Sequence, residues 1–468
     1  MSWPTQSLGA ICEIVSGITK DSKKQGDDYR EVPYLRVANV QRLQLDHAEV
    51  KTIPAKESSI ASYRLEPGDI LLNEGGDRDK LGRGWIWQGQ ISECIHQNHV
   101  FRARIRDGKA VPKWIAYYAN TNEARAYFLE SGKQTTNLAS ISKKNLSAFP
   151  VPLPPVHVQE TLVAEIDTQL SRLDEVVTTL QGIQAKLKQA RASILKAAVE
   201  GRLVETEAEW ARSDGREYED ATSFLARITS GKQGKSSKMR KLPDRLEETE
   251  AGMAHLTALP EGWSLVTISD VGETITGSTP PTSEPDFYED KGIPFLKPTD
   301  LNDGINTGSA RQYLSAKGSS RARLVPPLTV LVTCIGATIG KTGLATSLCA
   351  TNQQINCLIP SPEIAKTKYL FWYLRSPFAQ YDITANASAT TLPILNKSKF
   401  SRLPIFLPPP AEQYRIAAEV ERRFSVLDQV EATVQASIAR CTKLRQAILK
   451  SLLKNPATSA RMHQLPIR

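Results

Sequence analysis

Apolar side chains recur at alternating spacings of four and three residues in two long stretches of the chain, 156–200 and 411–455. This spacing puts them on one stripe of an α-helix and is typical of helices that pair along a heptad seam, as in a coiled coil. We call these positions the helix seam: Ile166, Leu170, Leu173, Val177, Leu180, Leu187 and Ile194 in the first helix, and Val420, Phe424, Leu427, Val434, Ile438, Ile448 and Leu452 in the second.

The two stretches are copies of one another. A Leu-Pro-Pro sequence starts at Leu153 before the first and at Leu407 before the second, an offset of 407 − 153 = 254. The same offset carries Gln159 onto Gln413 and continues through the helix without a gap. Because neither helix can bury its stripe alone, we expect the two to pack on each other in antiparallel fashion. The alternative is that each packs on its own domain or on a partner chain.

Symmetric pairing of the two seams predicts a register in which partner numbers sum to 618: Leu180 with Ile438, Leu187 with Glu431, and Leu173 with Arg445. Arg191 and Arg445 both fall on the seam, where a dry interface would disfavour a charge. Three outcomes remain open for these arginines. The seam turns outward there, or they meet carboxylates such as Glu431 or Asp428, or they meet partner subunits.

A block of about 150 residues precedes each helix, at 1–155 and at 261–410, with a connector at 201–260 and a tail at 456–468. Strand-like runs and a Gly-rich loop follow one another in both blocks, and the first block adds a short helical segment, although the blocks match less well than the helices. The predicted fold class is α+β. Two α/β domains are joined by two long antiparallel helices, with a pseudo-two-fold internal repeat.

The composition favours a cytoplasmic protein with a polyanionic partner. The formal charge is +9 and the pI is near 9.1, and Lys and Arg gain free energy by releasing counterions from phosphates. The six Cys form no Cys-x-x-Cys pair, which favours reduced core thiols over a zinc ribbon. No signal-peptide pattern and no apolar run of about 18 residues are present, so we expect no membrane span.

Familiar catalytic motifs fail on spacing. The stretch 336–342 resembles a phosphate-binding loop, but only three residues separate its glycines where four are needed. The acids at 286, 289 and 290 are too close together for a magnesium nuclease site, and no Pro-Pro pair lies in an amino-methyltransferase motif. His96 and His99 lack a third ligand. We therefore expect no catalytic residue, cofactor or metal in this chain.

Candidate DNA contacts gather at strand ends and in the Gly-rich loops. Glycines let a backbone approach a phosphate closely, and Arg or Lys then contacts phosphates or guanine edges. For any single residue, a charged hairpin tip is an equal alternative. The candidates are Arg36, Asn39, Arg78, Lys80, Arg83, Lys133, Gln134 and Asn137 in the first block, and Lys297, Thr338, Lys341, Thr390 and Thr391 in the second.

The whole layout resembles the DNA specificity subunit of type I restriction–modification enzymes. The resemblance rests on the two Leu-Pro-Pro-(x)₃-Gln starts at 153–159 and 407–413, and on the Leu-Asp pairs at 173–174 and 427–428. The Ile-Leu-Lys sequences at 194–196 and 448–450 and the Leu-Pro-Glu-Gly-Trp sequence at 259–263 add to it. It covers essentially the whole chain.

This resemblance implies two target recognition domains, each reading one half of a split site on double-stranded DNA, with the helices as a ruler. It implies no catalysis in this chain, but binding to two methyltransferase subunits and, in the full complex, to two restriction subunits. Methyl donor, ATP and Mg²⁺ would belong to those partners. Two alternatives stay open. A fused catalytic restriction or methylation enzyme lacks its expected motifs here, and a coiled-coil protein scaffold would select no split DNA consensus.

Overall fold

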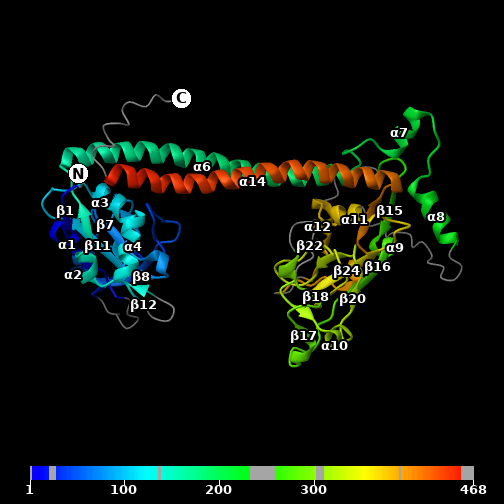
Figure 1. Cartoon of the computed structure of the whole chain (residues 1–468), viewed down its shortest axis with the longest axis horizontal. Helices are drawn as coiled ribbons and strands as arrows, with labels where there is room; N and C mark the ends of the chain where they lie inside the picture. Colours follow the sequence, from blue (N-terminus) through cyan, green and yellow to red (C-terminus); the bar gives the residue numbers. More distant parts are fainter. Residues whose placement is uncertain are drawn as a thin grey trace. The chain divides into compact units, whose positions relative to one another are not determined.

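The computed structural model describes residues 3–19, 28–134, 139–231, 259–301, 310–388 and 392–454. The chain forms two compact units: unit 1 comprises Met1–Gly182 and Val434–Arg468, and unit 2 comprises Ile183–Thr433. Two long helices, α6 (Val156–Val199) and α14 (Pro410–Lys454), are each divided between the units (Figure 1). Their bounds lie within one residue of the predicted ones. Among the described residues, no helix combines the length and apolarity that crossing a membrane requires.

Unit 1 is built on an antiparallel four-stranded sheet in the order β2-β11-β7-β9. The strands are β2 (Cys12–Ser16), β11 (Val100–Ile105), β7 (Ile70–Asn73) and β9 (Gly84–Ile86). Buried Leu and Ile side chains of this sheet share a core with α3 (Pro112–Ala119) and α4 (Asn122–Ser131). A second sheet pairs β10 (Ile95–His96) with β3 (Tyr29–Leu35) in parallel, and β3 with β6 (Lys51–Lys56) in antiparallel fashion.

Unit 2 repeats this plan. Its antiparallel sheet has the order β16-β24-β21-β22, formed by β16 (Gly272–Thr276), β24 (Ile355–Pro360), β21 (Val330–Thr333) and β22 (Thr342–Leu344). Helices α11 (Thr367–Leu374) and α12 (Pro377–Ala385) take the places of α3 and α4. The parallel pairing of β10 with β3 recurs as the pairing of β18 (Ile293–Leu296) with β23 (Cys349–Thr351). The internal repeat therefore extends from the helices into the sheets.

Each unit buries the start of one long helix together with the end of the other, and equivalent residues are used in both. The core of unit 1 takes Leu162, Val163, Ile166 and Leu170 from α6 and Ile448, Leu449, Leu452 and Leu453 from α14. Adding or subtracting 254 gives the unit 2 set: Ile416, Ala417, Val420 and Phe424 from α14, and Ile194, Leu195, Ala198 and Val199 from α6. Within each unit, a long helix therefore packs on its own block and on the end of the other long helix. This arrangement combines the expected packing of the helices on each other with packing of each helix on its own domain.

All fourteen seam residues are buried or half-buried, and most positions between them are exposed. The two arginines on the seam meet carboxylates. In unit 2, Arg191 pairs with Asp428 at 2.6 Å and with Glu431 at 2.7 Å, which is one of the three outcomes that the sequence left open. In unit 1, Arg445 pairs with Asp174. The pairs 191 + 428 and 174 + 445 both sum to 619, one more than the predicted 618. In unit 1, residues 162–170 share a core with 448–453, and Asp174, further along α6, pairs with Arg445, further back along α14, so these helix segments run antiparallel.

The connector belongs to unit 2 where the structure describes it. It begins with α7 (Glu207–Asp214), which ends at Gly215 in a left-handed conformation with φ 63°. Helix α8 (Ala221–Gly231) follows. Glu207 is buried between Arg216 and Arg415, at 2.6 Å from each. Burial opposes its ionisation, but the two arginines outweigh it and lower the pKa of Glu207.

Candidate nucleic-acid interface

The Gly-rich loop of unit 1 connects β7 to β9 and carries β8 (Gly75–Gly76) and a short 3-10 helix, η1 (Arg78–Lys80). Arg83 anchors it: its Nε donates to the carbonyl of Val40 at 3.1 Å, and burial lowers its pKa. Gly82 has φ +64°, and a Cβ there would come within 2.1 Å of the Phe128 ring. Only glycine fits this turn, so close packing fixes the loop. The side chain of Arg83 therefore has a structural role at the base of the loop.

Two other candidates in this loop lie differently. Arg78 is exposed on η1, and within the described residues its guanidinium forms no ion pair. Lys80 is half-buried and pairs with Asp77. Arg78 is thus the loop's most accessible cation for a phosphate or a base edge.

The structure places Arg36 and Asn39 directly after β3. Arg36 is half-buried, and its guanidinium lies 3.4 Å from the carbonyl oxygen of Glu49. Asn39 is only 3 % exposed. Its Oδ1 accepts from the Arg36 amide at 3.0 Å, and its Nδ2 donates to the carbonyls of Asp46 and Glu49 at 2.9 Å each. Asn39 therefore holds this loop together, and its burial argues against the predicted contact with DNA.

Three candidates from the end of the first block lie at β12 (Lys133–Gln134) and the residues after it. β12 pairs with β13 (Ala139–Ser140), which pairs with β8 of the Gly-rich loop. Lys133 is exposed. The fold thus brings Lys133 and the Gly-rich loop into one small sheet, although 50 residues of sequence separate them. Asn137 and the side chain of Gln134 lie outside the described residues.

In unit 2 the matching loop connects β21 to β22. Thr338 is exposed and Lys341 is half-buried. Because a strand and not a helix follows, this loop cannot act as a phosphate-binding loop at a helix N-terminus, which agrees with the rejection from spacing. Gln380 supports the backbone of this loop, because its Nε2 donates to the carbonyl of Gly340 at 2.9 Å.

The remaining candidates of the second block are Lys297, Thr390 and Thr391. Lys297 follows β18 and is half-buried, with its Nζ 5.6 Å from the centre of the Phe295 ring. Thr390 and Thr391 lie outside the described residues. A bridge between Ile335 and Ile394 nevertheless corresponds to the β8–β13 pairing of unit 1. Both units therefore bring their Gly-rich loop and the end of their block together.

The histidines within the described ranges show no catalytic arrangement. His96 is fully buried, its Nδ1 lies 2.7 Å from the carbonyl oxygen of Val100, and burial lowers its pKa to about 4. His99 instead contacts Glu74 at 2.9 Å on the surface. Among the described residues, no three His, Cys, Asp or Glu side chains gather as metal ligands would.

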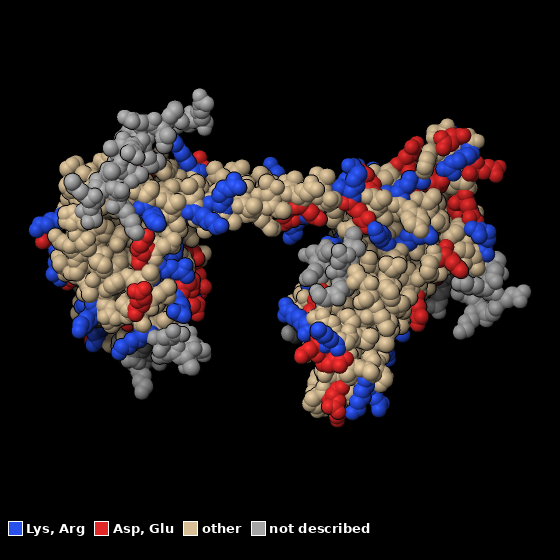
Figure 2. All heavy atoms as spheres, in the orientation of Figure 1, with Lys and Arg blue, Asp and Glu red and all other residues tan. Residues whose placement is uncertain are grey.

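Sequence reasoning missed Arg42, at the tip of a tight hairpin beside the Gly-rich loop. It donates to the carbonyl of Asp79 at 3.3 Å and to the Oδ1 of Asn120 at 3.5 Å. Burial, followed by the nearby charges of Arg125 and Arg83, lowers its pKa, while Asp79 opposes this. No pattern in the sequence indicates that residues 42, 83 and 125 lie close together. On the face drawn in Figure 2, basic and acidic side chains are interspersed, so such local clusters matter more than the net charge.

Comparison with known families decides what these paired blocks are. A family model described as type I restriction modification DNA specificity domain matches residues 2–189 and 260–440, most of both halves. The chain belongs to this family. It is a DNA-recognition subunit and has no catalytic activity of its own, as the sequence resemblance implied.

Named relatives extend over the full length. The specificity subunit of the type I restriction enzyme HindI from Haemophilus influenzae is 25 % identical, over 96 % of this chain and 98 % of that protein. The EcoBI specificity subunit from Escherichia coli is 22 % identical, over 98 % and 87 %. A solved structure of a type I restriction–modification system, at 18 % identity, covers 97 % of this chain and 98 % of its own with a TM-score of 0.64. This last likeness supports the fold alone.

Proposed function

We propose that each unit reads one half of a split site on double-stranded DNA, and that α6 and α14 form an antiparallel coiled coil that sets the distance between the halves. The observation that carries the proposal is the repeat itself. Two sheets of one topology present equivalent loops, and both are built on the same pair of helices. A duplicated reader attached to a stiff spacer is suited to a bipartite sequence.

The helices have the length that a ruler needs. At 1.5 Å per residue, the 44 residues of α6 extend about 66 Å. The ion pairs of Arg191 with Asp428 and of Arg445 with Asp174 are related by the 254-residue offset, which supports a symmetric register. Such a register would resist sliding, because a shift would separate both pairs and misalign the seam.

The loops support different half-sites for the two units. Arg78 and Lys133 are exposed at the loops of unit 1, whereas Thr338 is exposed at the matching loop of unit 2. An arginine can make a bidentate contact with guanine, but a threonine cannot. Two unlike reading loops on one scaffold favour an asymmetric recognition sequence.

The helices also offer equivalent docking positions for two methyltransferase subunits. Val176 and Val430 are related by 430 − 176 = 254, lie off the seam, and are 48 % and 40 % exposed. Two equivalent apolar positions suit two copies of one partner. The restriction subunits of a full complex would join such an assembly, and methyl donor, ATP and Mg²⁺ would be bound by those partners. Val176→Glu alone should leave one methyltransferase copy bound, as measured by the mass of the complex, with Thr179→Glu as the control. Loss of neither copy would contradict this.

Selection from randomised duplexes tests the proposal. The chain should enrich a consensus in two parts with a fixed, unread spacer, and a single continuous consensus or none would overturn it. Arg78→Ala should relax one half alone, by about 1–3 kcal/mol at a base it reads, and Thr338→Ala should affect only the other half. A variant that relaxes both halves would contradict the assignment of one half to each unit.

A further inference from the structure

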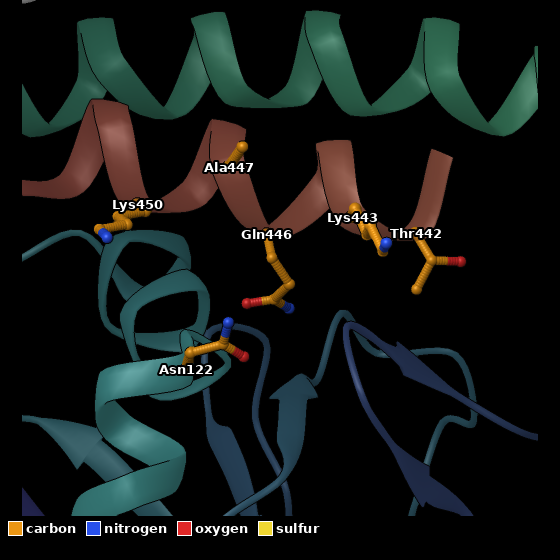
Figure 3. Close-up of a pocket in the computed structure, with 6 residues that line it drawn as sticks. All are labelled: Asn122, Thr442, Lys443, Gln446, Ala447 and Lys450. Carbon is orange, nitrogen blue, oxygen red and sulfur yellow. The ribbon is translucent and has the colours of Figure 1, made fainter. Parts of the chain in front are cut away.

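A groove of about 360 Å³ lies between α4 and α14 in unit 1. It is lined by Asn122, Thr442, Lys443, Gln446, Ala447 and Lys450. Figure 3 shows Lys443, Gln446 and Lys450 on α14, above Asn122 on α4. Lys443 and Lys450 are seven residues apart, so they share one face of the helix at a spacing of about 10.5 Å.

The described residues that line the groove include two lysines and no acidic side chain. Lys443, Lys450 and Arg125 are exposed, and within the part of the chain that the structure describes none of the three forms an ion pair. Arg125 lies in the first turn of α4, three residues after Asn122. Glu123 lies in the same turn, and the partial positive charge at the start of this helix adds to the field of the cations. An anion in the groove would relieve their mutual repulsion.

Hydrogen bonds connect the groove to the Gly-rich loop. Gln446 donates from Nε2 to the carbonyl of Asn120 at 3.4 Å, and the side chain of Asn120 accepts from Arg42. Arg42 in turn contacts the carbonyl of Asp79 in the loop. Arg42, Arg83 and Arg125 are close enough for the last two to lower the pKa of the first. One run of cations therefore extends from the loop to α14.

We propose that this groove holds backbone phosphates of the DNA that flank the half-site read by unit 1. The inference rests on the proposed function and adds residues of the spacer helix to the DNA interface. Continuity with the Gly-rich loop favours DNA over an acidic protein segment, because a duplex seated on that loop presents a row of phosphates spaced about 3.4 Å along each strand. Lys443 and Lys450 then position the duplex and read no bases.

The second half of the chain lacks this site. The first residue of α12, which corresponds to Asn122, is Pro377. Subtracting 254 from 443 and 446 gives Gln189 and Ala192, so a lysine and the bridging glutamine are lost. The phosphate contact is therefore one-sided, and only one half-site should have it.

Titration of DNA affinity against salt tests this in the full chain. For Lys443→Gln/Lys450→Gln, the slope of log affinity against log salt should become less steep by about 1.8, and affinity near 0.15 M salt should fall about thirtyfold. Sequence preference should not change, because phosphates carry no sequence information. The matched control is Lys109→Gln/Lys144→Gln, which removes the same two charges from exposed positions of unit 1 outside the groove. We expect it to resemble the wild type.

Uncharged methylphosphonates locate the contact. Substituting phosphates beside one half-site should weaken the wild type, and should have no further effect on the double variant. The groove inference is overturned if the double variant matches the control in slope and affinity. This includes the case in which the only defect of the double variant is in binding a protein partner. A wild type that selects no split consensus would instead overturn the proposed function, so the two failures can be told apart.

Discussion

Units 1 and 2 share the contacts that support their loops, but the loops themselves carry different side chains. Gln159 and Gln413 make the same three contacts. Each accepts through Oε1 from a backbone amide, Val111 or Lys366, at 2.8 Å, and donates through Nε2 to the carbonyls of Pro154 and Lys109 or of Pro408 and Ile364. This explains the Leu-Pro-Pro-(x)₃-Gln motif. The glutamine ties the first turn of the long helix to the segment before α3 or α11.

Other support contacts are kept although the side chains differ. Lys113 pairs with Asp167 at 2.7 Å, and Lys368 pairs with Glu421 at 2.9 Å. Where Trp114 donates to the carbonyl of Pro152, the hydroxyl of Tyr369 donates to that of Phe406. A buried carbonyl needs a donor in either unit, whichever side chain supplies it. The contacts where each block meets the helices are therefore preserved, whereas the side chains of the Gly-rich loops, which we propose read DNA, differ between the units.

The largest expected difference between the units is at Glu412, whose counterpart 254 residues earlier is Val158. Glu412 is fully buried and accepts from the amide of Glu207 at 2.9 Å and from Nε1 of Trp263 at 2.8 Å. Burial outweighs these donors and raises its pKa from 4.5 to about 7. Because the folded state holds the proton more tightly, its contribution to stability falls as pH rises from about 4.5 to 7, by about 3 kcal/mol in total.

Urea unfolding at pH 5 and pH 8 measures this effect. Glu412→Gln should remove most of this loss of stability between the two pH values. Glu160→Gln, at an exposed position of α6, should leave the loss unchanged. An unchanged pH dependence in Glu412→Gln would show that the connector contact does not distinguish the units.

The next effect tests their likeness. Gln159→Ala and Gln413→Ala should each lower the free energy of unfolding by about 2 kcal/mol, because each leaves a backbone amide without its acceptor. Amide hydrogen exchange should accelerate at Val111 in the first variant and at Lys366 in the second. Gln181→Ala, at an exposed site on α6, is the control. Costs that differ between the two variants by more than about 1 kcal/mol would break the equivalence.

The smallest effect concerns the seam arginines. Arg191 contacts two carboxylates and lies 6.0 Å from the centre of the Phe424 ring, whereas Arg445 contacts Asp174. The aspartates are mostly exposed, so we expect Arg191→Ala to cost about 1 kcal/mol and Arg445→Ala about 0.5 kcal/mol. Double-mutant cycles with Asp428→Ala and Asp174→Ala, at low and high salt, measure the coupling. Equal coupling energies that do not respond to salt would contradict this account.

Much of the scaffold was predictable because its signals are local and periodic. The apolar spacing and the Leu-Pro-Pro starts located both helices to within one residue, and the carboxylates named for the seam arginines include both partners of Arg191. Spacing alone also rejected the phosphate-binding loop. The candidate interface was predicted less well. The exposure of Arg78 is consistent with its predicted contact with DNA. Asn39 and Arg83 also have polar side chains, but these form hydrogen bonds inside the protein.

The sequence by itself determined the duplication, the long helices, the seam and the family, since each depends on residue types at fixed separations along one chain. The tertiary structure decided which polar side chains remain available to a ligand. That choice depends on burial and on partners far away in sequence, such as Val40 for Arg83 or Asn120 for Arg42 and Gln446. It also decided that Lys443 and Lys450 face α4 across a groove, because only folding brings α14 beside a block that ends 250 residues earlier.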